Sequence, residues 1–152
     1  MSAELLASIP VGFVMETDYV TAEPWETLGE TAEKMTRSDY GSALVVDAGR
    51  VVGILTSRDL VRAIAGRTHS SEARVREWMT SDPRVVRPDT LAGEAALIMV
   101  EQDCHHLPVV DENCRPVGLI GMRAVVSETF ERFSEATTVL GIKERTDSAW
   151  TE

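Results

Sequence analysis

The chain has 152 residues, 43% of them hydrophobic and 26% charged, which is an ordinary globular composition. Its formal net charge of −10 argues against a nucleic-acid backbone as partner, although a small anionic ligand needs only one local basic patch. Its two cysteines are too few for a disulfide framework, so we expect reduced thiols in the cytoplasm. The chain shows no signal peptide and no apolar run of the roughly 18 residues that span a membrane.

The first half of the chain alternates short apolar strands with amphipathic helices. Residues 1–13 are rich in aliphatic side chains and predict an arm that packs on the main body. Residues 67–77 are mostly polar and predict a linker. Between them, the apolar spacing and the turn glycines predict a strand over 20–22, a helix over 27–37, strands over 43–46 and 51–55, and a helix over 57–65.

The pattern then begins again 64 residues later. Met99 matches Met35, Asp103 matches Asp39, and Pro88, Gly93 and Ala96 also find their counterparts at this shift. After the second hairpin turn the shift becomes 65, because that turn is one residue longer. A shift this constant indicates a duplication of a β-α-β-β-α unit. Two copies packed sheet to sheet would bury the faces that one copy exposes, which gives an α+β fold with pseudo-two-fold symmetry and clefts where the copies meet.

Four stretches carry a family resemblance: VTAEPWETLGETAEKM, GSALVVDAGRVVGILTSRDLV, VREWMTSDPRVVRPDTLAGEAALIM and HHLPVVDENCRPVGLIG. Together they resemble a tandem pair of cystathionine-β-synthase (CBS) domains, often called a Bateman module. The resemblance implies a ligand-sensing module, commonly for adenine nucleotides, that often pairs into a flat dimer. We expect an N-terminal arm over 1–13, CBS repeats over 14–66 and 78–134, a linker over 67–77, a C-terminal helix over about 123–134 and a tail over 135–152.

The helix that starts at Thr56 carries the most informative motif. A helix N-terminus favours an anion, and the Asp59 carboxylate can accept hydrogen bonds from hydroxyl groups. Thr-x-x-Asp is equally a capping box that needs no ligand. The resemblance implies that Asp59 binds ribose and that Thr56 and Arg58 face the ribose or phosphate. It places a second wall on the other copy, at Arg84 and Val85 near the base and at His105, His106 and Pro108 near the sugar-phosphate.

The second copy lacks both side chains of this motif. Gly121 stands where the first copy has Thr56, and Ala124 stands where it has Asp59. We therefore expect one competent site per chain and one degenerate site. The wall of that degenerate site would come from Thr21, Ala22, Ser42 and Ala43.

Other polar residues can be explained without a metal site or a catalytic role. Cys104, His105 and His106 do not predict a metal site, because neighbouring residues of a strand point to opposite faces. The two histidines are equally well explained as polar residues that lead into a buried strand. No Ser-His-Asp or Cys-His arrangement indicates nucleophilic catalysis, so we expect no enzyme.

These observations predict a regulatory module that senses AMP, ADP, ATP or another adenosyl ligand and requires no cofactor. Because no effector domain is recognisable, it would act on an unidentified effector protein, without nucleic acid or membrane, and as a homodimer. The alternative is a ligand-free structural domain that mediates dimerisation.

Overall fold

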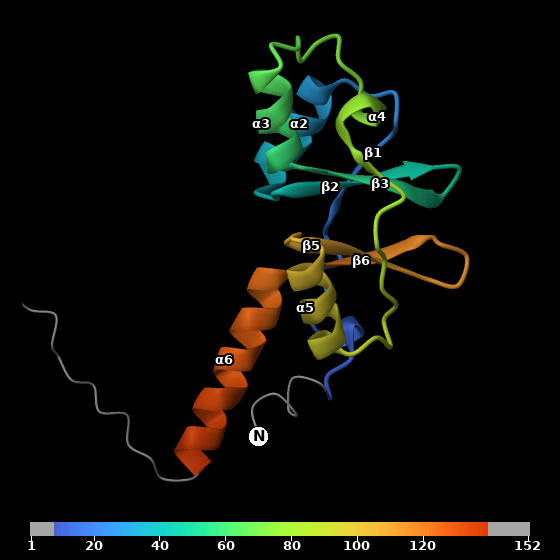
Figure 1. Ribbon diagram of the computed structural model, residues 1–152. Coiled ribbons are helices and arrows are strands. Elements are labelled where there is room, and N and C mark those ends of the chain that lie inside the picture. The colour runs from blue at the N-terminus through green and yellow to red at the C-terminus, as the bar shows by residue number, and fades with distance from the viewer. Residues whose placement is uncertain (1–7, 140–152) are drawn as a thin grey trace, which may run out of the picture.

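The chain folds into two β-sheets stacked face to face, each covered by helices on its outer side (Figure 1). The computed structural model describes residues 8–139, so residues 1–7 of the expected arm and 140–152 of the expected tail lie outside the described part. In chain order the elements are η1 (Val11–Phe13), β1 (Val20–Ala22), α2 (Leu28–Ser38), β2 (Ser42–Asp47), β3 (Arg50–Thr56), α3 (Ser57–Ala65), α4 (Val75–Trp78), β4 (Thr80–Ser81), α5 (Ala92–Glu101), β5 (His106–Val110), β6 (Pro116–Gly121) and α6 (Met122–Val139).

The strands and helices expected from the first repeat are confirmed, with bounds that shift by a residue or so. The first sheet has the order β1-β2-β3-β4, in which β1 runs parallel to β2 and the other pairs are antiparallel. The second sheet is the β5-β6 hairpin, extended on its edges by single bridges from Val86 to Val109 and from Glu16 to Leu119. Helix α6 extends beyond the predicted 123–134.

The first segment of each repeat packs against the other repeat. Strand β4, at the start of the second repeat, pairs with β3, and a Cβ added at Gly53 would overlap the Met79 side chain. Likewise, Glu16 pairs with β6, and a Cβ added at Gly118 would lie 3.1 Å from the Glu16 carbonyl oxygen. Both glycines are therefore required by a close backbone approach. The two repeats are consequently locked together by exchanged segments.

Part of the expected linker is built into the first repeat. Ala73 and Val75 are buried in its core. The Leu28 N–H donates to the Ala73 carbonyl at 3.0 Å, and the Val75 N–H donates to the Glu26 carbonyl at 2.9 Å. Helix α4 thereby covers the first sheet beside α3, before the chain crosses to the second sheet.

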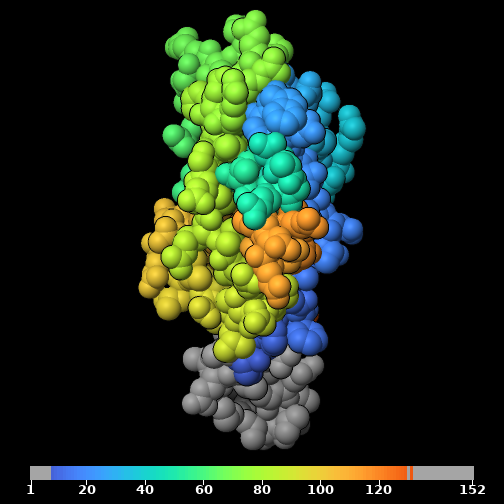
Figure 2. Space-filling view, turned by 90° about the vertical axis from the view of Figure 1, so that its right-hand side faces the viewer, coloured from blue at the N-terminus to red at the C-terminus, as the bar shows by residue number. Residues whose placement is uncertain are grey.

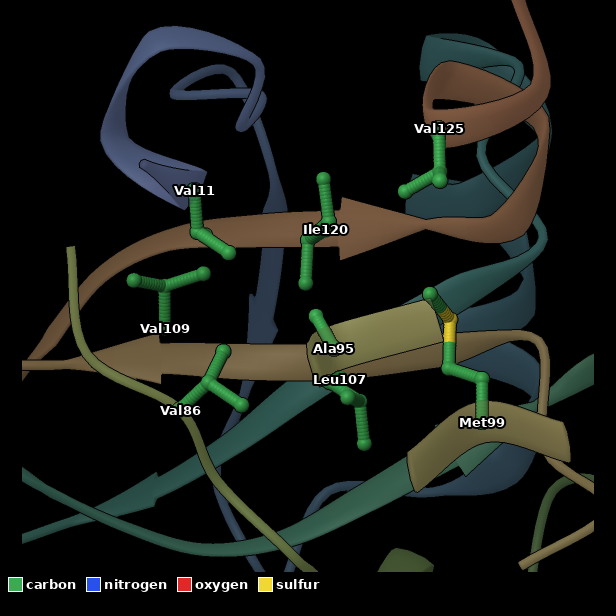
Figure 3. Packing of buried hydrophobic residues seen from close by; sticks show 8 residues of the cluster. All are labelled: Val11, Val86, Ala95, Met99, Leu107, Val109, Ile120 and Val125. Carbon is green, nitrogen blue, oxygen red and sulfur yellow. The ribbon is translucent and has the colours of Figure 1, made fainter. Parts of the chain in front are cut away.

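Each repeat has its own apolar core, and a third cluster joins the sheets. Leu44 and Ile54 of the first sheet pack on Leu119 of the second, all three at most 6% exposed. Full burial of each such side chain contributes about 1.5–3 kcal/mol. The predicted sheet-to-sheet packing of two repeats is thus confirmed. Figure 3 shows the core of the second repeat, made of Val11, Val86, Ala95, Met99, Leu107, Val109, Ile120 and Val125.

Candidate functional site

Helix α3 begins with a closed hydrogen-bonded cap. The Asp59 carboxylate accepts on Oδ2 from the Thr56 backbone N–H at 2.9 Å and from the Thr56 hydroxyl at 3.1 Å. Its second oxygen, Oδ1, lies 3.5 Å from Nη1 of Arg62. The residue is only 5% exposed. The capping interaction that the sequence allowed is therefore present, and it uses Oδ2 while Oδ1 makes the longer contact with Arg62.

The start of α3 also reaches across to the second repeat. Nη1 of Arg58 lies 3.6 Å from the Asp103 carboxylate and 3.5 Å from the Asp103 carbonyl oxygen. Both side chains are well exposed, at 63% and 85%, so the pair contributes little to stability. Its significance is geometric, because it shows that the N-terminus of α3 lies beside the loop that leads into β5.

A second chain of contacts makes the same connection. The Ser57 N–H and hydroxyl both donate to the Gly41 carbonyl, at 3.0 and 3.2 Å. A Cβ on Gly41 would lie 3.7 Å from the His106 ring, which comes from the second sheet. We call this convergence the α3–β5 corner; its residues are Gly41, Thr56, Arg58, Asp59, Asp103 and His106.

Side chains on the inner faces of both sheets point towards this corner. Leu55 packs in the core under the helices, so Thr56 points to the opposite face, towards the second sheet. Leu107 packs in the second core, so His106 and Pro108 point towards the first sheet. The structure thus brings Thr56, His106 and Pro108 to one inter-sheet layer.

The remaining predicted wall residues lie close to β5. Arg84 is exposed and Val85 is half-buried, and both precede Val86, which bridges to β5. His105 is exposed, and its carbonyl accepts from the Met122 N–H at 2.8 Å. Its side chain is therefore on the outer face, opposite to that of its neighbour in sequence.

His106 is the titratable group at the centre of this layer. Burial, and then the neighbouring His105, lower its pKa from 6.5, while Glu16 acts in the opposite direction. Its imidazole is therefore neutral near pH 7, with one nitrogen that donates and one that accepts. Burial, and then Asp103, raise the pKa of the Cys104 thiol, which disfavours a reactive thiolate there.

The residues expected at the degenerate site have different surroundings. A Cβ on Gly121 would lie 3.3 Å from the His106 ring, so the His106 side chain takes the space that a larger residue would need. Ala22 and Ala43 pack under the helices, away from the inter-sheet layer. Ala124 packs beside the second core, and Thr21 is exposed.

Three polar residues near this layer need separate mention. The hydroxyl of Ser42, whose predicted role was in the degenerate wall, is buried and has no hydrogen-bond partner within residues 8–139. Tyr40 and Glu16 were missed by the sequence reasoning. Burial, and then the carboxylates of Glu16 and Asp18, raise the pKa of the Tyr40 hydroxyl. Comparing one repeat with the other gives no signal for the interaction between Tyr40 and Glu16, because Glu16 lies in a segment that packs against the opposite repeat.

The surface also carries a shallow hollow away from the α3–β5 corner. It encloses about 330 Å³ and lies at the opposite end of β5, beside the turn to β6. Its lining residues are Arg87, Pro88, Asp89, Val110, Asp111, Glu112 and Asn113. Among residues 8–139, no three His, Cys, Asp or Glu side chains are grouped as metal ligands.

Comparison with known proteins identifies the family. The CBS domain model matches this chain twice, at residues 11–66 and 75–131, and the chain belongs to that family. Two copies, 64 residues apart, make it a tandem CBS pair. A protein of Methanopyrus kandleri with no assigned function is 30% identical over 142 residues, which cover 86% of this chain and 72% of the relative.

Two solved structures share the fold and hold adenosyl ligands. A CBS domain pair in complex with 5′-methylthioadenosine and S-adenosyl-L-methionine is 25% identical, with a TM-score of 0.70 over 84% of this chain and 97% of the other. The cytosolic domain of the Mg²⁺ channel MgtE, in complex with ATP, is 30% identical, with a TM-score of 0.67 over 84% of this chain and 51% of the other. Within the described residues of the present chain, no helix is both long and apolar enough to span a membrane.

Proposed function

We propose that this chain is a regulatory module that binds an adenosyl ligand of the AMP, ADP or ATP class at the α3–β5 corner and thereby modulates a partner protein. The observation that carries this proposal is the Arg58–Asp103 contact, which joins the helix-start motif of one repeat to the start of β5 in the other. The adenosyl ligands of the two similar structures support the same ligand class.

The chemistry of the corner suits the parts of a nucleotide. The N-terminus of α3 offers backbone N–H groups and a partial positive charge to a phosphate, and Arg58 adds a guanidinium. Asp59 would accept from the ribose hydroxyls through Oδ1, since its cap interaction uses Oδ2. Val85 would offer an apolar contact to the base, and Pro108 would line the sugar-phosphate side. His106, being neutral, would donate one hydrogen bond without adding charge.

A ligand held at this corner touches both repeats and would therefore favour one arrangement of them over another. The energy available for such a shift equals the difference in ligand affinity between the two arrangements. A partner protein that distinguishes the arrangements would respond to the ligand. We expect the module to act as a homodimer, in a regulatory and not a catalytic role, and in the cytoplasm, where Cys104 and Cys114 stay reduced.

A ligand-free dimerisation domain is the second candidate. The closed Thr56–Asp59 cap favours it, because both residues already have a structural role without any ligand. Under this alternative the corner only fixes how the two repeats pack.

A thermal-shift panel with AMP, ADP, ATP, NAD and S-adenosylmethionine separates the two functions. A ligand at 100 times its dissociation constant adds about 2.7 kcal/mol of stability. For a chain of this size the melting temperature should rise by roughly 5–10 °C. A panel in which no compound moves the melting temperature would refute the sensor proposal for these ligands and favour the dimerisation domain.

A further inference from the structure

Asp103 lies in a turn that occurs twice in the chain. It follows α5 with a φ of 49°, and Asp39 follows α2 with a φ of 56°. Each of them donates its backbone N–H at 3.3 Å to the carbonyl three residues earlier, that of Val100 for Asp103 and that of Thr36 for Asp39. The two aspartates therefore share one backbone conformation, in the left-handed region that Asp, Asn and Gly tolerate.

Within residues 8–139, Asp103 is paired with a cation and Asp39 is not. Nη1 of Arg58 lies 3.6 Å from the Asp103 carboxylate. Arg123 holds the position of Arg58 in the second repeat, at the shift of 65, yet it makes no ion pair with Asp39. The turn itself therefore does not require the pair. The pair occurs beside the repeat whose helix-start motif is complete, and its mirror image is not formed beside the repeat that lacks the motif.

The Arg58–Asp103 pair is also not needed to hold the repeats together. At the opposite end of the sheets, the teal turn between β2 and β3 lies against the orange turn between β5 and β6 (Figure 2). There the Val51 N–H donates to the Cys114 carbonyl at 3.0 Å. The exchanged segments lock the repeats independently of the corner. The Asp103 side chain can therefore be changed without loss of the arrangement.

The charged side chains of the α3–β5 corner offset one another in pairs. The Asp103 carboxylate lies against Arg58, and Arg62 lies 3.5 Å from the Asp59 carboxylate. His106 is neutral near pH 7. The N-terminus of α3 adds a partial positive charge of roughly half an elementary charge. The corner is therefore suited to one phosphate group and has little positive charge to offer to a chain of three.

A phosphate bound at Arg58 would lie near the Asp103 carboxylate. Both contacts of Arg58 with Asp103 use Nη1, so a phosphate can bind the other N–H groups of the guanidinium or can take the place of the carboxylate. Both side chains are well exposed, which makes the pair weak enough to be replaced. In either case a carboxylate stays close to the ligand, and its repulsion grows with the negative charge of that ligand.

We propose that Asp103 is a specificity-determining residue of the α3–β5 corner, which makes the site favour an adenosine monophosphate over the diphosphate and the triphosphate. The inference rests on the proposed function, because it selects one member of the ligand class given there. Asp103 acts through its charge and through Arg58, and it needs no direct contact with the ligand.

Calorimetric titrations of the full chain with adenosine, AMP and ATP, in the absence of divalent cations, test this role. Wild type should bind AMP more tightly than ATP. Asp103→Asn removes the charge and keeps the turn, because asparagine readily adopts a left-handed conformation. This variant should bind adenosine as wild type does, AMP about threefold more tightly and ATP about tenfold more tightly, since the repulsion that it removes grows with ligand charge.

The matched control is Asp39→Asn, which removes the same charge from the same turn in the first repeat. It should leave all three affinities within about twofold of wild type, because Asp39 faces no arginine of the corner. The gain of Asp103→Asn for ATP should also shrink in about 1 M salt, where charges are screened over about 3 Å. A purely structural role of Asp103 would produce neither the dependence on ligand charge nor the dependence on salt.

The possible results separate this inference from the proposed function. Circular dichroism checks that each variant folds, and Asp103→Gly with Asp39→Gly replaces any variant that does not. A wild type that prefers ATP, an equal gain for adenosine, AMP and ATP in Asp103→Asn, no gain for ATP, or the same gain in Asp39→Asn would overturn the role of Asp103 alone. Binding of none of the three compounds by any of the proteins would overturn the proposed function for these ligands, and the inference with it.

Discussion

Replacing Asp59 with alanine should lower the free energy of unfolding of the ligand-free protein by about 2 kcal/mol. The carboxylate accepts two hydrogen bonds from Thr56, at 2.9 and 3.1 Å, in a site where the residue is 5% exposed. Each such bond contributes about 1 kcal/mol net, and its loss leaves a backbone N–H without a partner in a protected position. Asp59→Asn keeps one acceptor oxygen and should lose only about half as much.

Urea denaturation followed by tryptophan fluorescence gives these differences directly, provided that the slope with denaturant is unchanged. Glu30→Ala is the matched comparison, because Glu30 closes the equivalent capping box with Thr27 at the start of α2 and, unlike Asp59, is exposed. It should cost about 0.5–1 kcal/mol. An Asp59→Ala protein that is as stable as wild type would refute the assignment of this carboxylate to the cap.

Three further outcomes follow from the packing and the charges. The pKa of His106 is lowered in the folded state, so the unfolded state takes up a proton more readily and stability is lost as pH falls through about 6.5. His106→Asn removes this titration, so the melting temperature should depend less on pH between about pH 7.5 and 5.5. Gly53→Ala should cost about 1–3 kcal/mol in urea denaturation, because the new methyl group meets Met79 and the β4 backbone. Thr31→Val should cost about 1 kcal/mol, because the buried hydroxyl donates to the Glu26 carboxylate at 3.0 Å; a change below 0.3 kcal/mol would contradict that bond.

The sequence predicted the repeat architecture because a duplication leaves a signal at every level. The shift of 64 fixed which strands and helices are equivalent, and apolar spacing predicted a helix over 57–65, where α3 lies. These signals are local or periodic, so the sequence of one chain is enough to detect them.

The exchange of segments between the repeats was not predictable in the same way. Periodicity shows that Val75 or Val11 faces a core, but it does not show which of two similar cores that is. The exchange is recorded in the contacts of Met15 with Gly118 and of Met79 with Gly53. The sequence alone does not reveal these contacts, because they can be recognised only when the positions of the two sheets are known.

The site was predictable in part for a related reason. The helix-start motif is contiguous, so Thr56, Arg58 and Asp59 could be singled out from the chain alone. Asp103 completes the corner through Arg58, yet at the sequence level it was only one member of a matched pair with Asp39. The roles of the predicted residues towards a ligand stay predictions.

A calorimetric titration with AMP of wild type, Asp59→Ala and Glu30→Ala tests the central claim most directly. Both variants lose a helix cap, but only Asp59 lies at the α3–β5 corner. The account predicts one AMP per chain for wild type and Glu30→Ala, and an affinity at least about tenfold lower for Asp59→Ala, since hydrogen bonds from the ribose to a carboxylate are lost. Equal affinity in all three proteins, or no binding to wild type of AMP, ADP, ATP or S-adenosylmethionine, would contradict it.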